Sequence, residues 1–359
     1  MNKKILILNP VGFIGGAEVS LLSFIKHNPD LIYKIILPFP GNLTDSLKEL
    51  NIKYSVVYPD VDFNKLSRKS FNIFSFFNFV KYAYKIKNNI SNDKFDIIYS
   101  NGIKMHLTGL LLSLMIRKKI VWHFRDILNN KYIKTLFYFL SLFTKIVICN
   151  SNLTAKQFPR FKTKTIFNSV ENVHNIKLKN SETKKLAMVA HLTSLKNIDI
   201  AIDTMKYLDD DYTLHIFGEE PYLTQQPYKE ILLKKAIENN VSKRVFFHGF
   251  LTDISKIYTN CDLFLTLSER ESFGRTNIEA LSYKKPILTT ATGIFHKKSS
   301  LPFVLDYVSL KPESLSRKIR QVFDDYYGFN FKCNTFWMKN KKKFDIIRNN
   351  KNIKKVILC

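Results

Sequence analysis

The sequence contains few cysteines, and they are scattered. Cys149, Cys261, Cys333 and Cys359 lie far apart and form no C-x-x-C pair. This spacing argues against a zinc site and against a disulfide framework. We therefore expect free thiols in a reducing, cytoplasmic environment.

Long uninterrupted apolar runs are also absent. The two longest apolar stretches, residues 103–122 and 132–149, are broken by lysine and arginine, so neither offers the roughly eighteen apolar residues that a membrane-spanning helix needs. Residues 5–8 form an apolar run that is too short for the core of a signal peptide, and a turn at Asn9-Pro10 follows it. This run predicts a first strand.

Acidic residues are scarce relative to basic ones. The chain has 56 Lys+Arg against 30 Asp+Glu, a net charge of +26, which favours a polyanionic partner such as nucleic acid, an anionic membrane or a phosphorylated ligand. Hydrophobic residues make up 45% and aromatic residues 14%, which excludes an intrinsically disordered or collagen-like chain. At 359 residues the chain should hold two globular domains.

Short apolar runs alternate with stretches of helical character. They cover residues 5–8, 33–37, 96–100, 120–123 and 146–149, and, after a polar stretch at 168–185, residues 186–189, 213–217, 245–248, 263–267 and 286–289. Such runs are typical of strands buried on both faces of a parallel sheet. The pattern predicts an α/β fold with two doubly wound domains, which bind ligands at the carboxyl ends of their strands.

The segment after the run 263–267 carries the strongest chemical signal. A turn with Gly274 leads into a predicted helix near Thr276, where free N–H groups and the positive end of the helix dipole attract a phosphate. Glu271 and Glu279 lie in the turn and in the early helix, so both carboxylates can reach one ligand. Lys196, on the loop after the run 186–189, would balance a diphosphate.

These residues give the chain a resemblance to the GT-B glycosyltransferases of family 4, the group 1 glycosyl transferases, which are retaining enzymes with an E-x7-E motif. The residues that match the family's order are His248-Gly249-Phe250, Tyr258, Cys261-Asp262, Glu271, Phe273-Gly274, Glu279 and Lys285-Pro286. A lone E-x7-E pair arises often by chance, whereas this ordered set is specific.

The resemblance implies a GT-B architecture, in which two Rossmann-like domains face each other across a cleft. Residues 1–168 would form the acceptor-side domain, and residues 169–330 the domain that binds a nucleotide sugar. Residues 331–359 would form a basic segment that packs back on the first domain.

The resemblance also implies roles for residues of the second domain. The donor hexose would be held by Glu271 and the backbone of Ser272, Phe273 and Gly274, the ribose by Glu279, the diphosphate by Thr276 and Lys196, and the base near Phe250. His191 stands where the family has a phosphate-binding arginine, and Asn197 stands where it has a glycine. Histidine still donates to phosphate but lacks the forked geometry of arginine.

In the first domain, the resemblance assigns Gly15 and Gly16 to a glycine-rich loop near the donor phosphate and the acceptor, and His123 to the donor sugar. From the residues alone, other readings stay open. Adjacent glycines serve any tight turn, a histidine at a strand end can be structural, and Arg125 and Asp126 can pair with each other.

The implied reaction moves a hexose from a UDP- or GDP-linked sugar to a saccharide acceptor, with retention of the anomeric configuration. The leaving phosphate takes the acceptor proton, so the resemblance implies no covalent intermediate, no metal and no cofactor besides the donor substrate. The barrier is charge separation, which cations and N–H groups at the diphosphate lower.

Two segments combine aromatic with basic residues: residues 68–87 and residues 337–344. Together with the net charge, they favour peripheral attachment to the anionic inner face of the cytoplasmic membrane. A lipid-linked acceptor would lie there, as in the assembly of surface polysaccharide or lipopolysaccharide. The alternative for residues 68–87 is a core-facing helix with solvated lysines.

Three rival functions remain. A nucleic-acid-binding protein would use the same charge, but the sequence has no zinc finger, RRM signature or recognition helix, and we expect no nucleic-acid partner. A metal-dependent GT-A transferase needs a D-x-D motif, which Asp60-Val61-Asp62 spells. A sugar-nucleotide epimerase or hydrolase of the same fold would turn over the donor without an acceptor.

Overall fold

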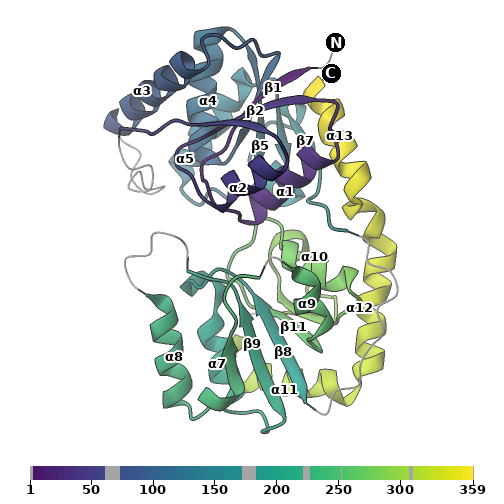
Figure 1. The fold of residues 1–359 in the computed structure, drawn as a ribbon. Coiled ribbons are helices and arrows are strands. Elements are labelled where there is room, and N and C mark those ends of the chain that lie inside the picture. Colours follow the sequence, from purple (N-terminus) through teal and green to yellow (C-terminus); the bar gives the residue numbers. More distant parts are fainter. Residues whose placement is uncertain are drawn as a thin grey trace. The chain divides into compact units, whose positions relative to one another are not determined.

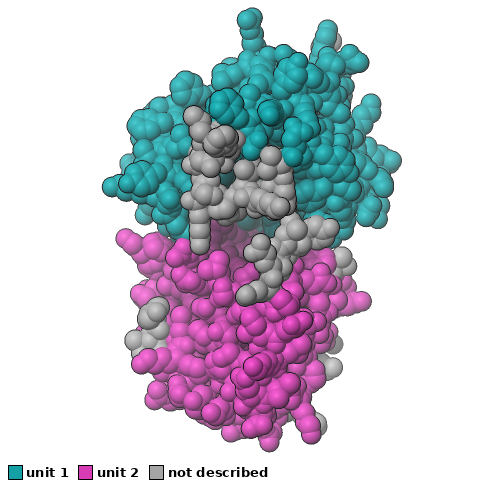
Figure 2. Space-filling view, turned by 90° about the vertical axis from the view of Figure 1, so that its left-hand side faces the viewer, with its two compact units in different colours: residues 1–169, 346–359 teal, residues 170–345 magenta. Residues whose placement is uncertain are grey.

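A computed structural model describes residues 3–60, 73–171, 183–220, 227–251, 253–306 and 310–358, with the side chains of α3 described from residue 76. The chain forms two compact units. Unit 1 comprises residues 1–169 and 346–359, and unit 2 comprises residues 170–345 (Figure 2). Each unit is built on one parallel sheet (Figure 1).

Unit 1 contains a sheet of seven strands in the order β3-β2-β1-β4-β5-β6-β7, and all neighbours are parallel. The strands are β1 (Lys4–Leu8), β2 (Ile32–Leu37), β3 (Lys53–Val56), β4 (Ile97–Asn101), β5 (Lys119–Phe124), β6 (Ile146–Cys149) and β7 (Thr163–Thr165). The helical segments between them are α1 (Gly16–Lys26), α2 (Asn42–Glu49), α3 (Ile73–Asn89), α4 (Ile103–Ile116), α5 (Lys131–Leu140), η1 (Ser141–Phe143), α6 (Asn152–Ala155) and η2 (Arg160–Lys162). The strand order changes direction between β1 and β4, where doubly wound sheets bind ligands.

Strand β1 shows why its sequence is apolar without alternation. Leu6 and Leu8 belong to a core cluster on one face of the sheet, and Ile5 and Ile7 belong to a second cluster on the other face. Successive side chains of a strand point to opposite faces, so a strand that is covered on both sides must be apolar throughout.

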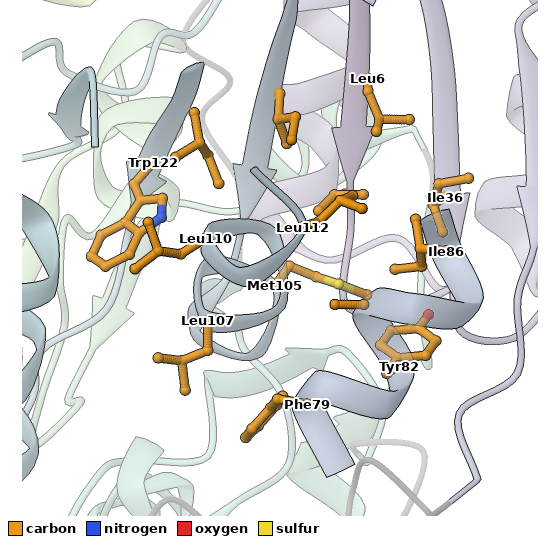
Figure 3. Packing of buried hydrophobic residues seen from close by; sticks show 14 of the residues in the cluster. Leu6, Ile36, Phe79, Tyr82, Ile86, Met105, Leu107, Leu110, Leu112 and Trp122 are labelled. Carbon is orange, nitrogen blue, oxygen red and sulfur yellow. The ribbon is translucent and has the colours of Figure 1, made fainter. Parts of the chain in front are cut away.

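Helix α3 contributes to the first of these clusters. Phe79, Tyr82 and Ile86 of α3 lie near Met105 and other residues of α4 beneath the sheet (Figure 3). The described part of the segment 68–87 is therefore a core-facing helix on this side, while Phe76, Phe77 and Tyr84 are exposed. Residues 68–72 lie outside the described residues.

Unit 2 contains a sheet of six strands in the order β10-β9-β8-β11-β12-β13, again parallel throughout. The strands are β8 (Lys184–Val189), β9 (Tyr212–Phe217), β10 (Val245–Phe247), β11 (Leu263–Thr266), β12 (Ile287–Thr290) and β13 (Val304–Leu305). The helical segments are η3 (Ser194–Lys196), α7 (Ile198–Met205), α8 (Tyr228–Glu238), η4 (Ser242–Arg244), α9 (Ile254–Thr259), α10 (Arg275–Ser282), η5 (Gly293–Phe295), α11 (Pro312–Asp324), α12 (Tyr326–Asn340) and η7 (Lys341–Phe344).

The last helix, α13 (Ile346–Leu358), belongs to unit 1 although it follows unit 2 in the chain (Figure 1). Its residues Ile353 and Ile357 are buried in the second core cluster of unit 1. Asn350 Nδ2 donates to Ser23 Oγ of α1 at 2.9 Å, and Lys145 Nζ donates to the carbonyl of Ile357 at 2.7 Å. Helix α13 therefore completes the core of unit 1.

The predicted α/β class with two doubly wound parallel sheets is confirmed. Strands β3, β7 and β13 were not expected, because they are short edge strands and two of them carry polar residues. The expected terminal segment 331–359 is divided in the structure: residues 331–345 remain in unit 2, and residues 346–358 pack on unit 1. Among the described helices, none combines the length and the apolar character needed to cross a membrane.

The three described cysteines, Cys149, Cys261 and Cys333, are free and buried. Burial raises the pKa of each thiol to about 12, so each stays protonated at neutral pH and acts as a small apolar side chain. Cys359 lies outside the described residues.

Candidate active site

In unit 2, the loops that follow β8, β9 and β10 meet through their backbones. Gly218 N donates to the carbonyl of Gly249 at 2.8 Å, and Leu192 N donates to the carbonyl of Glu219 at 3.0 Å. Gly218 has φ +136°, and a Cβ placed on it would lie 2.0 Å from the carbonyl oxygen of Ala190. Only glycine permits this approach, which gathers three strand ends at one edge of the sheet.

Two predicted binding residues lie on these loops. Phe250 is 44% exposed, and its backbone N–H donates to Glu219 Oε1 at 3.4 Å. His191, on the loop after β8, is exposed as well. Glu219 joins both loops, yet the sequence analysis did not single it out, because one carboxylate after a strand carries no specific signal.

Lys196 and Glu271 lie together in the structure. Lys196 Nζ donates to Glu271 Oε1 at 2.5 Å, and the two side chains are only 22% and 20% exposed. The loops that carry them are also joined, because Glu269 N donates to the carbonyl of Leu195 at 2.9 Å. An ammonium and a carboxylate are thus held side by side at the carboxyl edge of β8 and β11.

Asn197 explains one departure from the family pattern. It has φ +50° and stands directly before α7. Asparagine is one of the few residues other than glycine that adopt this left-handed conformation readily. Its side chain also donates to the carbonyl of Leu267 at 2.8 Å. Asparagine therefore meets the backbone requirement at the family's glycine position and adds a hydrogen bond to the residue directly after β11.

The His191 imidazole lies in the field of the Lys196–Glu271 pair. Partial desolvation lowers its pKa below the ordinary value, and the Lys196 ammonium adds to this effect. A hydrogen bond involving the backbone of Glu219 and the charge of Glu271 act in the opposite direction. The balance favours a neutral imidazole, so this position carries less positive charge than the arginine for which it stands.

Helix α10 begins at Arg275, directly after Gly274 with φ +84°. Asn277 fixes this helix start: its Oδ1 accepts from Thr266 Oγ1 of β11 at 2.7 Å, and its Nδ2 donates to Thr289 Oγ1 of β12 at 2.8 Å. The first N–H groups of a helix have no partner within the helix, so the start at Arg275 and Thr276 presents donors of the kind that bind phosphate.

The loop 271–274 rests on η5. Gly293 N donates to the carbonyl of Glu271 at 3.1 Å, and Ile294 N donates to the carbonyl of Phe273 at 3.0 Å. Gly293 has φ +56°, and a Cβ there would lie 2.2 Å from the carbonyl oxygen of Phe273. The backbone of Ser272, Phe273 and Gly274 is therefore held from behind by a glycine that the sequence analysis passed over.

The ring of Phe273 is buried and lies beside Phe344, which stacks on Trp337 with ring centroids 6.1 Å apart. This arrangement corrects the expectation for residues 337–344. Both aromatic rings of the segment belong to the core of unit 2 behind the loop 271–274, because their apolar area is buried there. They are not available as a basic-aromatic membrane patch.

Glu279 has two partners within unit 2. Its Oε1 accepts from Arg275 Nε at 2.6 Å, and its Oε2 accepts from Tyr258 Oη at 3.0 Å. The side chain is only 8% exposed. The proximity of this carboxylate, after the larger effect of burial, raises the pKa of Tyr258 well above its ordinary value. Arg275 and Tyr258 are therefore positioning residues for the second glutamate of the motif.

In unit 1, the glycine-rich loop leads from β1 into α1. Gly15 N donates to Glu18 Oε2 at 3.1 Å, which caps the helix start, whereas the space around Gly16 is open within 4 Å of a Cβ position. Glu18 is buried, and burial raises its pKa, while the Arg125 guanidinium and the hydrogen bonds it accepts oppose this shift.

His123 is buried near the carboxyl end of β5, and its Nδ1 has two partners. Arg125 Nη2 donates to it at 3.0 Å, and the Tyr99 hydroxyl forms a short hydrogen bond with it. A guanidinium only donates, so Nδ1 is an acceptor and the neutral ring carries its proton on Nε2. Burial, then the charges of Arg125 and His106, hold the pKa of His123 well below its ordinary value.

Arg125 orients a chain of side chains across three strand ends. Its Nη1 donates to Asn101 Oδ1, so Asn101 Nδ2 donates to Asn9 Oδ1 at 2.7 Å, and Asn9 Nδ2 donates to the carbonyl of Val11 at 2.8 Å. This series of hydrogen-bonded side chains ends next to the glycine-rich loop. Sequence analysis missed Asn9 and Asn101, whose only signal was their position directly after or at the end of a strand.

The predicted residues form one group in each unit. In unit 2, Lys196 contacts Glu271, and His191 lies in their electrostatic field. Ser272, Phe273, Gly274, Thr276 and Glu279 follow on one loop and helix start, and Phe250 stands on the neighbouring loop. In unit 1, Gly15 and Gly16 begin α1, and His123 ends β5. The roles assigned to these residues remain predictions.

The sequence left two alternatives open: a metal site at the D-x-D sequence and a pair between Arg125 and Asp126. Within the described ranges, no three His, Cys, Asp or Glu side chains lie close enough to hold a metal ion. Of the D-x-D sequence, Asp60 pairs with Lys85, and Val61 and Asp62 lie outside the described residues. The side-chain hydrogen bonds of Arg125 go to Asn101 and His123.

Residues 169–343 match the model of the glycosyl transferases group 1. The O-antigen biosynthesis glycosyltransferase WclY of Escherichia coli is 24% identical over 289 residues, which cover 69% of this chain and 79% of WclY. These matches confirm the resemblance on which the site residues were selected.

Two solved structures show the same fold. HepE of Anabaena, crystallised with UDP and glucose, gives a TM-score of 0.84 at 22% identity and covers 99% of both chains. The lipopolysaccharide outer core galactosyltransferase WaaB gives a TM-score of 0.66 at 17% identity, also over 99% of both chains. At these identities the likeness shows the fold alone, which is the GT-B fold of glycosyltransferases.

Proposed function

Since residues 169–343 form a group 1 glycosyltransferase domain, we propose that the chain is a retaining hexosyltransferase that uses a nucleotide diphosphate sugar. The observation that carries this proposal is the Lys196–Glu271 pair on loops next to the start of α10. One group is a cation suited to a diphosphate, and the other is a hydrogen-bond acceptor suited to sugar hydroxyls.

The chemistry follows from the charge that develops at each end of the breaking bond. As the bond between the sugar and the diphosphate stretches, negative charge grows on the phosphate and positive charge on the sugar ring. The Lys196 ammonium and the N–H groups at Arg275 and Thr276 stabilise the leaving phosphate. The Glu271 carboxylate, released from Lys196 as the diphosphate binds, holds a sugar hydroxyl.

Retention without a covalent intermediate requires the acceptor to attack from the face that the diphosphate leaves. The departing phosphate oxygen then accepts the acceptor proton, and no side chain acts as a nucleophile. The neutral His123 ring suits this scheme, because its buried Nε2–H has no hydrogen-bond partner among the described residues and can donate to a sugar hydroxyl.

We propose a UDP-hexose donor ahead of a GDP-hexose. Support comes from HepE, which was crystallised with UDP and glucose. The decisive test is a thermal-shift screen against UDP-, GDP- and ADP-hexoses, because bound ligand stabilises the folded state by mass action. We expect UDP-glucose or UDP-galactose to raise the melting temperature and the free hexoses to leave it unchanged. If no nucleotide sugar raises the melting temperature, the proposal is wrong.

The acceptor is proposed to be a lipid-linked saccharide at the inner face of the cytoplasmic membrane. WclY is named for O-antigen biosynthesis and WaaB for the lipopolysaccharide outer core, and both products are surface saccharides. Donor turnover that depends on added acceptor and continues in EDTA supports metal-independent transfer. Turnover of the donor at the same rate without acceptor favours an epimerase or hydrolase.

A further inference from the structure

Helix α5, which Figure 1 places in unit 1, and the 3-10 helix η1 after it both carry exposed apolar side chains. Phe137 faces the core and is 1% exposed, whereas Tyr132 is 84%, Phe139 57% and Phe143 71% exposed. A helix on the surface of a soluble domain normally turns polar residues outward. Single exposed apolar residues need no explanation, but a cluster of them indicates an interaction surface.

The cluster extends onto η2. Phe161 is 78% exposed, and its neighbour Lys162 donates from Nζ to the carbonyl of Thr144, the residue after Phe143, at 2.7 Å. This bond holds η2 next to the end of η1. The surface, named the α5 patch, consists of Tyr132, Tyr138, Phe139, Leu142, Phe143 and Phe161.

The stretch of sequence that carries the α5 patch has charges of one sign only. Residues 127–170 contain no Asp or Glu and seven Lys or Arg. The exposed basic residues in this range are Lys131, Lys134, Lys156, Arg160 and Lys164. Aromatic side chains within a basic surface match the boundary of an anionic bilayer, where rings enter the headgroup region and cations meet lipid phosphates.

We propose that the α5 patch docks this protein on an anionic lipid membrane. The partner class comes from the proposed function, whereas the patch itself rests on the exposed rings and the acid-free stretch. Two copies of this chain pairing through the patch would bring like charges together without any acidic partner, which opposes association. The lysine and arginine side chains have long apolar stems that let them reach the phosphates while the rings insert.

The experiment is co-sedimentation of the full chain with vesicles of phosphatidylglycerol and phosphatidylcholine, compared with phosphatidylcholine alone. We expect binding to the anionic vesicles that weakens as salt is added. Phe143→Ser combined with Phe161→Ser removes two rings, and Lys131→Gln combined with Lys134→Gln removes two charges. Each pair should lower partitioning at least about tenfold.

The matched control is Phe331→Ser, which removes a ring that is 71% exposed on α12 of unit 2. It should leave vesicle binding unchanged. Wild-type protein that binds neither vesicle, or that binds both equally, overturns the proposal. A patch variant that binds as well as wild type, or a Phe331→Ser variant that loses as much as the patch variants, overturns it too.

The thermal shift with UDP-hexose distinguishes a failure of the docking surface from a failure of the proposed function. The patch variants should keep the wild-type thermal shift with UDP-hexose and should turn over a water-soluble acceptor normally. Their loss should appear only with acceptor embedded in vesicles. Intact donor binding without vesicle binding in the wild type removes the docking surface alone, whereas absent donor binding removes the proposed function alone.

Discussion

The Lys196 ammonium donates to the Glu271 carboxylate at 2.5 Å, although 75 positions separate the two residues in the chain. The pair lies between the loop after β8 and the loop after β11, and each partner satisfies the other's charge while no diphosphate is bound. A binding diphosphate competes with Glu271 for the ammonium, so the site exchanges one ion pair for another.

Replacing Lys196 with Ala should lower kcat about a hundredfold, because a preorganised cation at the leaving phosphate acts mainly in the transition state. KM for the donor should change much less. Steady-state kinetics check this, with Lys243→Ala on the surface of η4 as the control for loss of one positive charge. An unchanged kcat would show that Lys196 serves the ion pair with Glu271 and does not act on the leaving phosphate.

Glu279 is expected to affect stability as well as donor affinity. Glu279→Gln removes the buried negative charge that pairs with Arg275 and accepts from Tyr258, and breaking a buried pair of this kind costs about 3 kcal/mol. Chemical denaturation measures the stability term, and UDP binding by calorimetry measures affinity. Tyr258→Phe serves as the comparison, since it removes one hydrogen bond to Glu279 and keeps the charge.

The pH dependence of donor binding should report on His191. Its pKa lies below the ordinary value, so the ring is neutral near pH 7 and a bound diphosphate favours its protonated form. Affinity should therefore rise as the pH falls, with proton uptake on binding. His191→Arg should bind about tenfold more tightly at neutral pH through charge-assisted bonds and should lose the proton uptake, as measured by calorimetry in buffers of different ionisation enthalpy.

His123 allows a test of its tautomer. Gln places an amide N–H near the position of the imidazole Nε2, whereas Asn places one near Nδ1. If His123 serves as an Nε2–H donor, His123→Gln should retain about a tenth or more of kcat/KM, and His123→Asn should lose at least about tenfold more. Equal losses in both variants would contradict this role. Ring ¹⁵N shifts of the wild type should place the proton on Nε2 independently of activity.

Two glycines should respond to alanine in different ways. Gly218→Ala forces a Cβ against the Ala190 carbonyl and should cost about 3 kcal/mol of unfolding free energy. Gly16→Ala meets open space at the start of α1, so stability should hold. If the glycine-rich loop approaches a ligand, the Gly16 variant should lose activity while keeping its Tm; full activity would leave Gly16 without a role in binding.

Much of the fold was predictable because buried parallel strands are apolar in a way that sequence shows directly. The run at residues 5–8 and the five runs of unit 2 all became strands. The edge strands β3, β7 and β13 were not predicted, because β3 and β7 carry polar residues and β13 is only two residues long. Pairing in space was harder to predict. The partners Arg125, Asn101 and Asn9 come from three strand ends whose adjacency depends on strand order.

In the site, the motif residues were predictable from the family pattern, and their supports were not. Glu279 was predicted to bind a ligand, but its partners Arg275 and Tyr258 are evident only from the structure. The sequence pattern does not show which ionisable groups are buried next to each other. The prediction that the aromatic residues of the segment 337–344 form a membrane patch was wrong for a related reason. Composition shows that rings are present, whereas burial against Phe273 depends on the path of the chain.

Helix α13 has a consequence for how the molecule is made. Ile353 and Ile357 complete the core of unit 1. The ribosome must therefore translate all of unit 2 before the core of unit 1 can be completed. Until then, the nascent N-terminal half exposes the apolar surface that α13 covers in the folded protein. Unit 2, in contrast, is one continuous stretch of chain and is the better candidate for expression by itself.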